Sequence, residues 1–341
     1  VRGGLTVSKS KTALLANQIS ITKQIADINP VLAASTVQNA RNLGADFSAG
    51  TVLRSTVRRA RLNNTAKRLL RLRSLRRAGA RTSRLAKTGL IPAAAYAVGV
   101  TGLSNTLLQA LRRQVRAASC LHTAGRSLTI DLALLGEGVD PAYLCNRAPI
   151  YLWCCAWWDG WVSKALLGVA MDKAFKDQLG SKSGWNKVKG PAGAVLATLR
   201  RIGWDVRATK SGTGCFARFL ETPEGPIDLD DVCPKTICVL VDRATRKLLW
   251  TQEVRIDPTI AHLQNGGNLD VLIKLLRSNA QEWGPKEKGC LRSVLARGVW
   301  TQDRLFRAGL VDDPMCKLCG GPGTPQHRLY HCLAYALWSD L

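Results

Sequence analysis

The chain has 341 residues, of which 46% are hydrophobic, and its 49 Lys and Arg against 24 Asp and Glu give a formal net charge of +25. This hydrophobic fraction can bury a core over two or three domains, which excludes a disordered basic tail. No apolar run reaches the roughly 18 residues of a membrane span, and 11 unevenly spaced Cys predict a reducing intracellular compartment, nuclear or cytoplasmic, and no secreted disulfide framework.

Residues 1–50 predict a small α/β segment. Leu5 and Val7 favour a strand near the start, the run ITKQIADINPVLAAST favours a helix, and Asn42-Leu43-Gly44 favours a turn. From the pattern alone, this is an ordinary piece of an α/β domain.

A long basic segment follows. Residues 54–87 contain 13 Lys or Arg and no Asp or Glu, and no carboxylate occurs between Asp46 and Asp131. The spacing predicts an amphipathic helix that ends at Gly79 and packs Leu53, Val57 and Leu69 inward. The arginines predicted to form its cationic stripe are Arg54, Arg58, Arg61, Arg68 and Arg71.

Two more helices are predicted, over residues 82–97 and 104–119. The last should pack Leu107, Leu108, Leu111 and Val115 inward and hold Arg112, Arg113 and Arg116 outward. Guanidinium groups on rigid helices bridge phosphates, so we expect sequence-independent binding to a polyanion. The other interpretations are a solvated charged face and an anionic membrane surface, and the scarcity of Trp and Phe in this segment disfavours the membrane.

Residues 127–284 predict a mostly helical connector. Trp153, Trp157 and Trp161 recur at four-residue spacing, which is typical of a buried helix face, and the adjacent Cys154 and Cys155 are expected to be buried thiols. Residues 170–190 predict an exposed linker, and residues 191–202 predict a helix. Short strands are expected near residues 206 and 216–220, while TICVLVDRATRKLLWTQEV fits either a strand pair or a helix.

The most specific motif lies near the C-terminus. Cys316-x2-Cys319-x7-His327-x4-Cys332 has the ligand types and spacing of a CCHC zinc knuckle, with Gly320 and Gly321 in the tight turn. His331 would give a Cys2His2 set with His327, so the fourth ligand is either Cys332, which we favour, or His331. A helix is expected to begin at Pro285, ahead of the knuckle.

Several of these motifs together resemble the C-terminal part of non-LTR retrotransposon reverse transcriptases. Gly4-Leu5-x-x-Ser8-x-x-Lys11-Thr12, followed by Asn42-Leu43-Gly44, resembles the end of the palm in that family. Three helices after the turn resemble the thumb, and a CxxC…H…C element after the thumb completes the order. The resemblance implies a mainly α chain made of a short α/β end of palm (1–50), a helical thumb bundle (51–126), a mostly helical connector (127–284) and a helix with a zinc knuckle (285–341).

The resemblance also implies a function. The parent enzyme would be an RNA-directed DNA polymerase that uses Mg²⁺, with Lys11 near the incoming triphosphate. The catalytic carboxylates would lie on palm strands upstream of Val1, and the missing N-terminal palm and fingers of the same polyprotein would be a partner of this chain. We therefore expect this chain to bind template–primer, as RNA or an RNA–DNA hybrid, and not to polymerise alone. The alternatives are a stand-alone zinc-containing nucleic-acid-binding protein derived from such an element, and a decayed copy.

Overall fold

The structure is a computed structural model, and it describes residues 13–14, 19–28, 36–37, 39–42, 45–48, 55–120, 124–181, 184–278 and 283–336. It is mainly α-helical with short strands, which confirms the predicted fold class. Lys11, Leu43, Gly44, Leu53 and Arg54 lie outside the described residues. Within the described ranges, every helix is too short or too polar to span a lipid bilayer.

The chain forms two compact units. The first joins Val1–Ser119 to Gly136–Gly267, and the second joins Cys120–Leu135 to Asn268–Leu341. These units do not follow the predicted boundaries at residues 50, 126 and 284. The basic helices share one unit with most of the connector, because helices α7 (Asn105–Ser119) and α9 (Pro141–Trp158) pack against each other.

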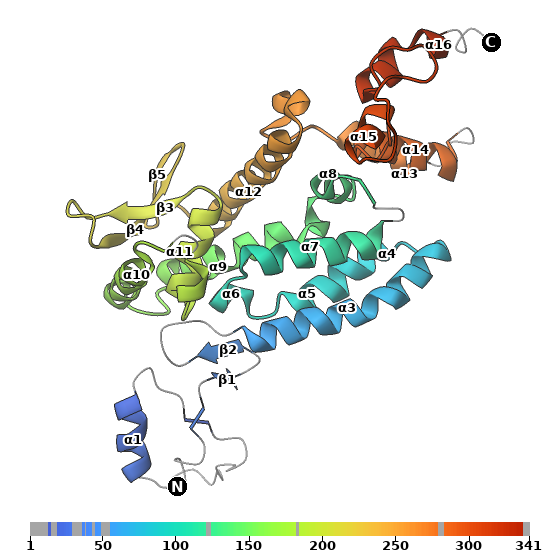
Figure 1. The fold of residues 1–341 in the computed structure, drawn as a ribbon. Helices are drawn as coiled ribbons and strands as arrows, with labels where there is room; N and C mark the ends of the chain where they lie inside the picture. Colours follow the sequence, from blue (N-terminus) through green and yellow to red (C-terminus); the bar gives the residue numbers. More distant parts are fainter. Residues whose placement is uncertain are drawn as a thin grey trace. The chain divides into compact units, whose positions relative to one another are not determined.

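The first unit begins with helix α1 (Ile19–Ile28) and an antiparallel pair of strands, β1 (Asn39–Asn42) and β2 (Ala45–Ser48). The basic segment forms α3 (Thr56–Arg77), which ends just before Gly79. Gly79 has a φ of 89°. A chain of short helical turns then runs through α4 (Thr82–Leu85), the π-helical turn η2 (Ala86–Leu90), α5 (Ile91–Ala94) and α6 (Val98–Thr101). Helix α7 (Asn105–Ser119) lies alongside α3, as Figure 1 shows.

Four longer helices and a small sheet build the rest of this unit. After η3 (Glu137–Val139), the helices are α9 (Pro141–Trp158), α10 (Lys164–Gln178), α11 (Pro191–Arg201) and α12 (Pro234–Ile256), with the turns η4 (Trp185–Lys187) and η5 (Pro258–Leu263). Strands β3 (Asp205–Ala208), β4 (Cys215–Thr222) and β5 (Gly225–Asp228) form an antiparallel sheet in the order β3-β4-β5. Helix α9 starts with proline in its first turn, and the preceding Asp140 carboxylate accepts from the Ala142 N–H.

The main core lies between these helices and the inner face of the sheet. Trp153, Leu196, Leu199, Leu220 and Val241 are among its buried residues. Trp157 is also buried, but Trp161 lies beyond the end of α9 and is exposed, so only two of the three predicted tryptophans belong to the core. Cys154 and Cys155 are buried as predicted.

Two assignments in the connector are resolved by the structure. The prediction that residues 170–190 form an exposed linker was wrong. Trp185 and Val188 are buried in its second half, and in its first half α10 continues to Gln178 and buries Met171 and Phe175. Their four-residue spacing places both on one helix face, although the surrounding Lys and Gly residues resemble a linker. The ambiguous run beginning at Thr236 is helical and belongs to α12.

The second unit consists of α8 (Leu128–Ala133), α13 (Asp270–Arg277), α14 (Pro285–Leu295), α15 (Gln302–Arg307), the π-helical turn η6 (His327–His331) and α16 (Leu333–Ala336). The Ser127 hydroxyl caps α8, and the Ser127 N–H donates to the Ala296 carbonyl at 2.7 Å. The segment that follows α7 in sequence is therefore bound to the end of α14.

Candidate metal centre and candidate nucleic-acid interface

Four side chains of the second unit converge on one point. The ligand atoms of Cys316, Cys319, His327 and Cys332 all lie within 4.8 Å of one another, and together they can hold a metal ion. Sγ of Cys332 lies 3.9 Å from Sγ of Cys316 and 3.7 Å from Sγ of Cys319, and Nε2 of His327 lies 3.0 Å from Sγ of Cys319. Three sulfurs and one imidazole nitrogen form the donor set.

The backbone around Cys316 shapes the first half of the cluster. The Cys316 N–H donates to the Gly321 carbonyl at 2.7 Å, and the Gly320 N–H donates to the Cys316 carbonyl at 2.8 Å. N–H groups of Leu318 and Cys319 point at the sulfur of Cys316 and lower the pKa of its thiol to about 6. A tight turn of this kind favours the thiolate, which is the form that binds metals.

Glycine is required where the turn meets the imidazole. A Cβ atom placed on Gly321 would lie 2.7 Å from Cε1 of His327, closer than side-chain carbons approach. His327 is buried, and its ring packs directly against this glycine. The ring position therefore depends on the absence of a side chain at residue 321.

The fourth side chain of the cluster is that of Cys332. Its side chain is buried beside the other sulfurs, whereas His331 is exposed and does not belong to the cluster. Cys332 follows the last residue of η6, so the π-helical turn carries His327 at its start and delivers Cys332 at its end. This geometry supports Cys332 over His331, which is the choice that the sequence spacing favoured.

The cluster is attached to α15. The Asp303 N–H donates to the Gly323 carbonyl at 3.1 Å, and the Gln302 amide donates to the Asp313 carbonyl at 3.0 Å. A Cβ atom on Gly323 would lie 2.2 Å from the Pro314 carbonyl oxygen, so the close approach of residue 323 to Pro314 also requires glycine. Helix α15 and the knuckle thus form one module.

Helix α3 presents a different inner face from the predicted one. Its inner row has alternating four- and three-residue spacing and contains two arginines as well as apolar residues. The row comprises Arg58, Leu62, Thr65, Leu69, Leu72 and Arg76. Thr65 and Leu62 bind Gln114 of α7, through a hydroxyl–amide hydrogen bond of 2.9 Å and an amide–carbonyl hydrogen bond of 3.1 Å.

Two predicted phosphate-binding arginines are buried. Arg58 is 5% exposed and donates to the carbonyl and hydroxyl oxygens of Thr101. Arg112 is 2% exposed, and its Nη2 lies 2.8 Å from Oδ2 of Asp140. The prediction that Arg112 points outward was wrong, because a buried carboxylate from the start of α9 binds it. Neither side chain is available to a phosphate in this structure.

The remaining candidates that the structure describes are accessible. Arg68, Arg71 and Arg113 are exposed, and Arg61 and Arg116 are half-buried. Helix α3 carries further exposed cations that the predicted stripe omitted. Together, the exposed cations of α3 are Arg59, Lys67, Arg68, Arg71, Arg73 and Arg77, and within the described part of the chain none of them forms an ion pair with a carboxylate.

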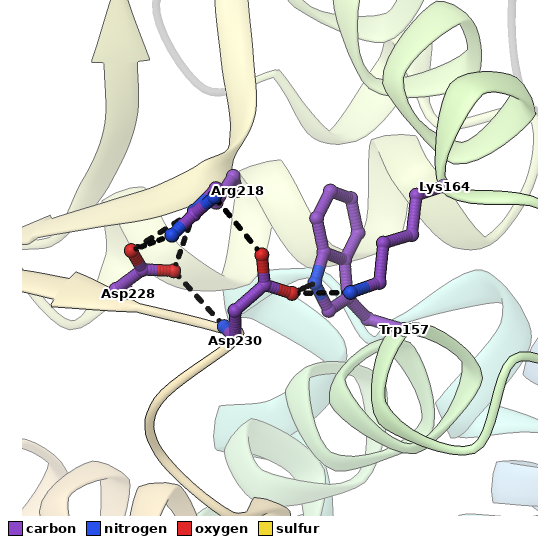
Figure 2. Close-up of polar contacts among 5 residues, drawn as sticks. All are labelled: Trp157, Lys164, Arg218, Asp228 and Asp230. Atoms are coloured by element: carbon purple, nitrogen blue, oxygen red, sulfur yellow. Dashed lines mark hydrogen bonds and ion pairs between the residues drawn. The ribbon is translucent and has the colours of Figure 1, made fainter.

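Acidic residues of the sheet have a different role. Figure 2 shows Arg218 of β4 held between Asp228 and Asp230, with its Nε 2.8 Å from Oδ1 of Asp228 and its Nη1 3.1 Å from Oδ2 of Asp230. Asp230 also accepts from Lys164 and from the indole N–H of Trp157, and these hydrogen bonds hold the pKa of its carboxyl below its usual range. Both carboxylates are neutralised by cations, so this Asp-rich turn ties the sheet to α9 and α10.

No protein-family model matches the chain, and no curated protein or solved structure matches it.

Proposed function

We propose that this chain binds the phosphate backbone of nucleic acid through the exposed cations of α3, as the thumb of a non-LTR-type reverse transcriptase. The observation that carries the proposal is a 22-residue helix whose exposed sides bear only positive charge. Ordinary solvated helices mix both signs of charge. A surface without carboxylates is instead suited to a polyanion.

The electrostatics of α3 favour a bound polyanion over free solvent. Lys67 and Arg71, and likewise Arg73 and Arg77, stand four residues apart and repel each other, at a cost of roughly 0.2–0.5 kcal/mol a pair. Phosphates replace this repulsion with charge-assisted hydrogen bonds and release condensed counterions. Such binding is independent of sequence, and an A-like RNA–DNA hybrid would be recognised by its backbone and shape.

A salt titration tests this proposal. Affinity for an RNA–DNA hybrid should fall steeply with salt, and the variant K67Q/R68Q/R71Q should flatten the slope of log K against log salt by about 2 to 3. The matched control K173Q/R243Q/K247Q removes three exposed charges from α10 and α12 and should leave the slope unchanged. Equal slopes for wild type and the α3 variant would refute the proposed interface.

We also propose that the Cys/His cluster binds Zn²⁺. In a tetrahedral site with Zn–S bonds of about 2.3 Å, neighbouring sulfurs stand about 3.8 Å apart. The sulfur of Cys332 lies 3.9 Å and 3.7 Å from those of Cys316 and Cys319, which fits that geometry. Thiolate and imidazole donors are the set that zinc prefers.

Metal analysis of the purified chain should give one zinc per molecule. Chelation should release it and unfold the knuckle, because knuckles of this size fold with their metal. C319S should lose zinc, whereas C290S, which changes an exposed thiol of α14 outside the cluster, should retain it. A chain that binds no zinc under reducing conditions would contradict this assignment.

The order of palm end, thumb and knuckle supports the wider proposal of a reverse-transcriptase parent, in which Mg²⁺ is held by carboxylates of the palm. The coding sequence upstream of Val1 tests it. A palm with two catalytic acid motifs in the same frame is expected. A start codon at this point with no palm would favour a stand-alone nucleic-acid-binding protein instead.

A further inference from the structure

An exposed tyrosine lies next to the basic helix. Tyr96 occupies the turn between α5 and α6 and is 53% exposed, although its neighbours Ala94, Ala95 and Val98 are buried. The turn therefore packs its small residues inward and holds one aromatic side chain at the surface.

Two arginines of α3 hold this turn. The guanidinium of Arg61 stacks over the Tyr96 ring, 4.6 Å from its centroid, and its Nη1 donates to the Tyr96 carbonyl at 3.3 Å. One turn of helix earlier, Arg58 donates to the carbonyl and hydroxyl of Thr101, at the other end of α6. The ring is thus fixed by the same helix that carries the exposed cations.

The backbone of the turn is strained. Ala97 has a φ of 62°, a left-handed conformation that non-glycine residues rarely adopt. Its carbonyl accepts from the Val100 and Thr101 N–H groups at 3.1 and 3.2 Å and from the Thr101 hydroxyl at 3.0 Å. Strained backbone that is held by such contacts clusters at functional positions, and Ala97 directly follows Tyr96.

We propose that Tyr96 is a stacking platform for an unpaired base next to the phosphate-binding surface of α3. This inference rests on the proposed function. The Arg61 guanidinium occupies one face of the ring, and a base of any identity stacks on the exposed remainder, since every base presents a π face. The ligand is a nucleic acid with a junction between duplex and single strand, in which α3 contacts the duplex phosphates and Tyr96 the first unpaired base.

Two related probes separate this inference from the proposed function. The full chain is titrated with a short blunt-ended RNA–DNA hybrid and with the same hybrid carrying an unpaired extension of a few nucleotides. Stacking of one base predicts that the extension raises affinity by about 5-fold to about 150-fold in wild type. Y96A should lose this gain but keep its affinity for the blunt hybrid, and Y96F should keep both.

The control variant is F216A, which removes an aromatic side chain of matching exposure, 52%, from β4. It should retain the preference for the extended hybrid. Equal affinity of wild type for the two hybrids would overturn the stacking site and leave the α3 interface standing, whereas no binding to either would overturn the α3 interface itself. A Y96A variant that melts earlier and weakens both hybrids equally would show that the stack only stabilises the turn, and this too would refute the inference.

Discussion

Replacing Arg112 by methionine should destabilise the first unit by about 3–5 kcal/mol, because breaking a buried ion pair leaves an uncompensated charge. Arg112 and Asp140 are 2% and 4% exposed, and Nε of Arg112 lies 3.0 Å from Oδ1 of Asp140. The methionine stem replaces much of the arginine's packing but none of its hydrogen bonds. Among the residues that the structure describes, Asp140 would keep only its capping bond from the Ala142 N–H, at 2.9 Å.

A double-mutant cycle isolates this pair. R112M, D140N and the double variant are compared by urea unfolding, followed by circular dichroism and by tryptophan fluorescence to check that one transition is observed. Asparagine still caps a helix, so D140N removes the charge and keeps the N-cap. The double variant should cost less than the sum of the single variants, by about 0.5–3 kcal/mol.

The next residue is a matched control. Arg113 is exposed on the same helix, so R113M should change stability by no more than about 0.5 kcal/mol. If Arg113 contacts phosphate, R113M should also reduce the salt slope for a hybrid by about 1. If R112M leaves stability unchanged and weakens nucleic-acid binding as R113M does, then Arg112 faces outward and the buried pair is refuted.

Acid should weaken the tie between the sheet and α9–α10, because hydrogen bonds from Lys164 and Trp157 depress the pKa of Asp230. A depressed pKa contributes stability that is complete at neutral pH and is lost as the pH falls from about 3.9, the unfolded value, through the folded value. The melting temperature of D230N should therefore fall less steeply in acid than that of wild type, and identical slopes would contradict the assignment. At the proposed zinc site, G321A should weaken zinc affinity by about 10-fold to 100-fold, since its methyl group would displace the His327 ring, which Gly321 contacts. Competition with a chromophoric chelator measures the zinc affinity. G289A is the control, because a Cβ atom at that position in α14 would meet no neighbouring atom. Unchanged zinc affinity of G321A would show that the His327 ring adjusts at no cost.

Features that depend on neighbouring residues could be predicted from the sequence. Asp140 and Pro141 mark the start of α9, Pro285 marks the start of α14, and Gly79 ends α3, because caps and breakers act within one helical turn. The Cys/His cluster was predicted for the same reason: all four ligands lie within one short segment, and their spacing alone brings them together.

Features that depend on partners far away in the sequence could not be predicted from it. Arg58 and Arg112 were predicted on outer helix faces because arginine is normally exposed. In the structure they are buried and bind Thr101 and Asp140, respectively. No local pattern shows that a carboxylate 28 residues away will neutralise a buried guanidinium. The stack of Arg61 on Tyr96, 35 residues away, was missed for the same reason.

The sequence by itself determined the charge of α3, its helical character and the donor set of the Cys/His cluster, since these follow from residue types and short spacings. The tertiary structure decided which arginines of the basic helices are structural and which remain exposed. It also grouped residues 120–135 with the C-terminal module, through the hydrogen bond from Ser127 to Ala296. Long side chains reach whichever partner the fold supplies, and that partner is settled only when the helices pack.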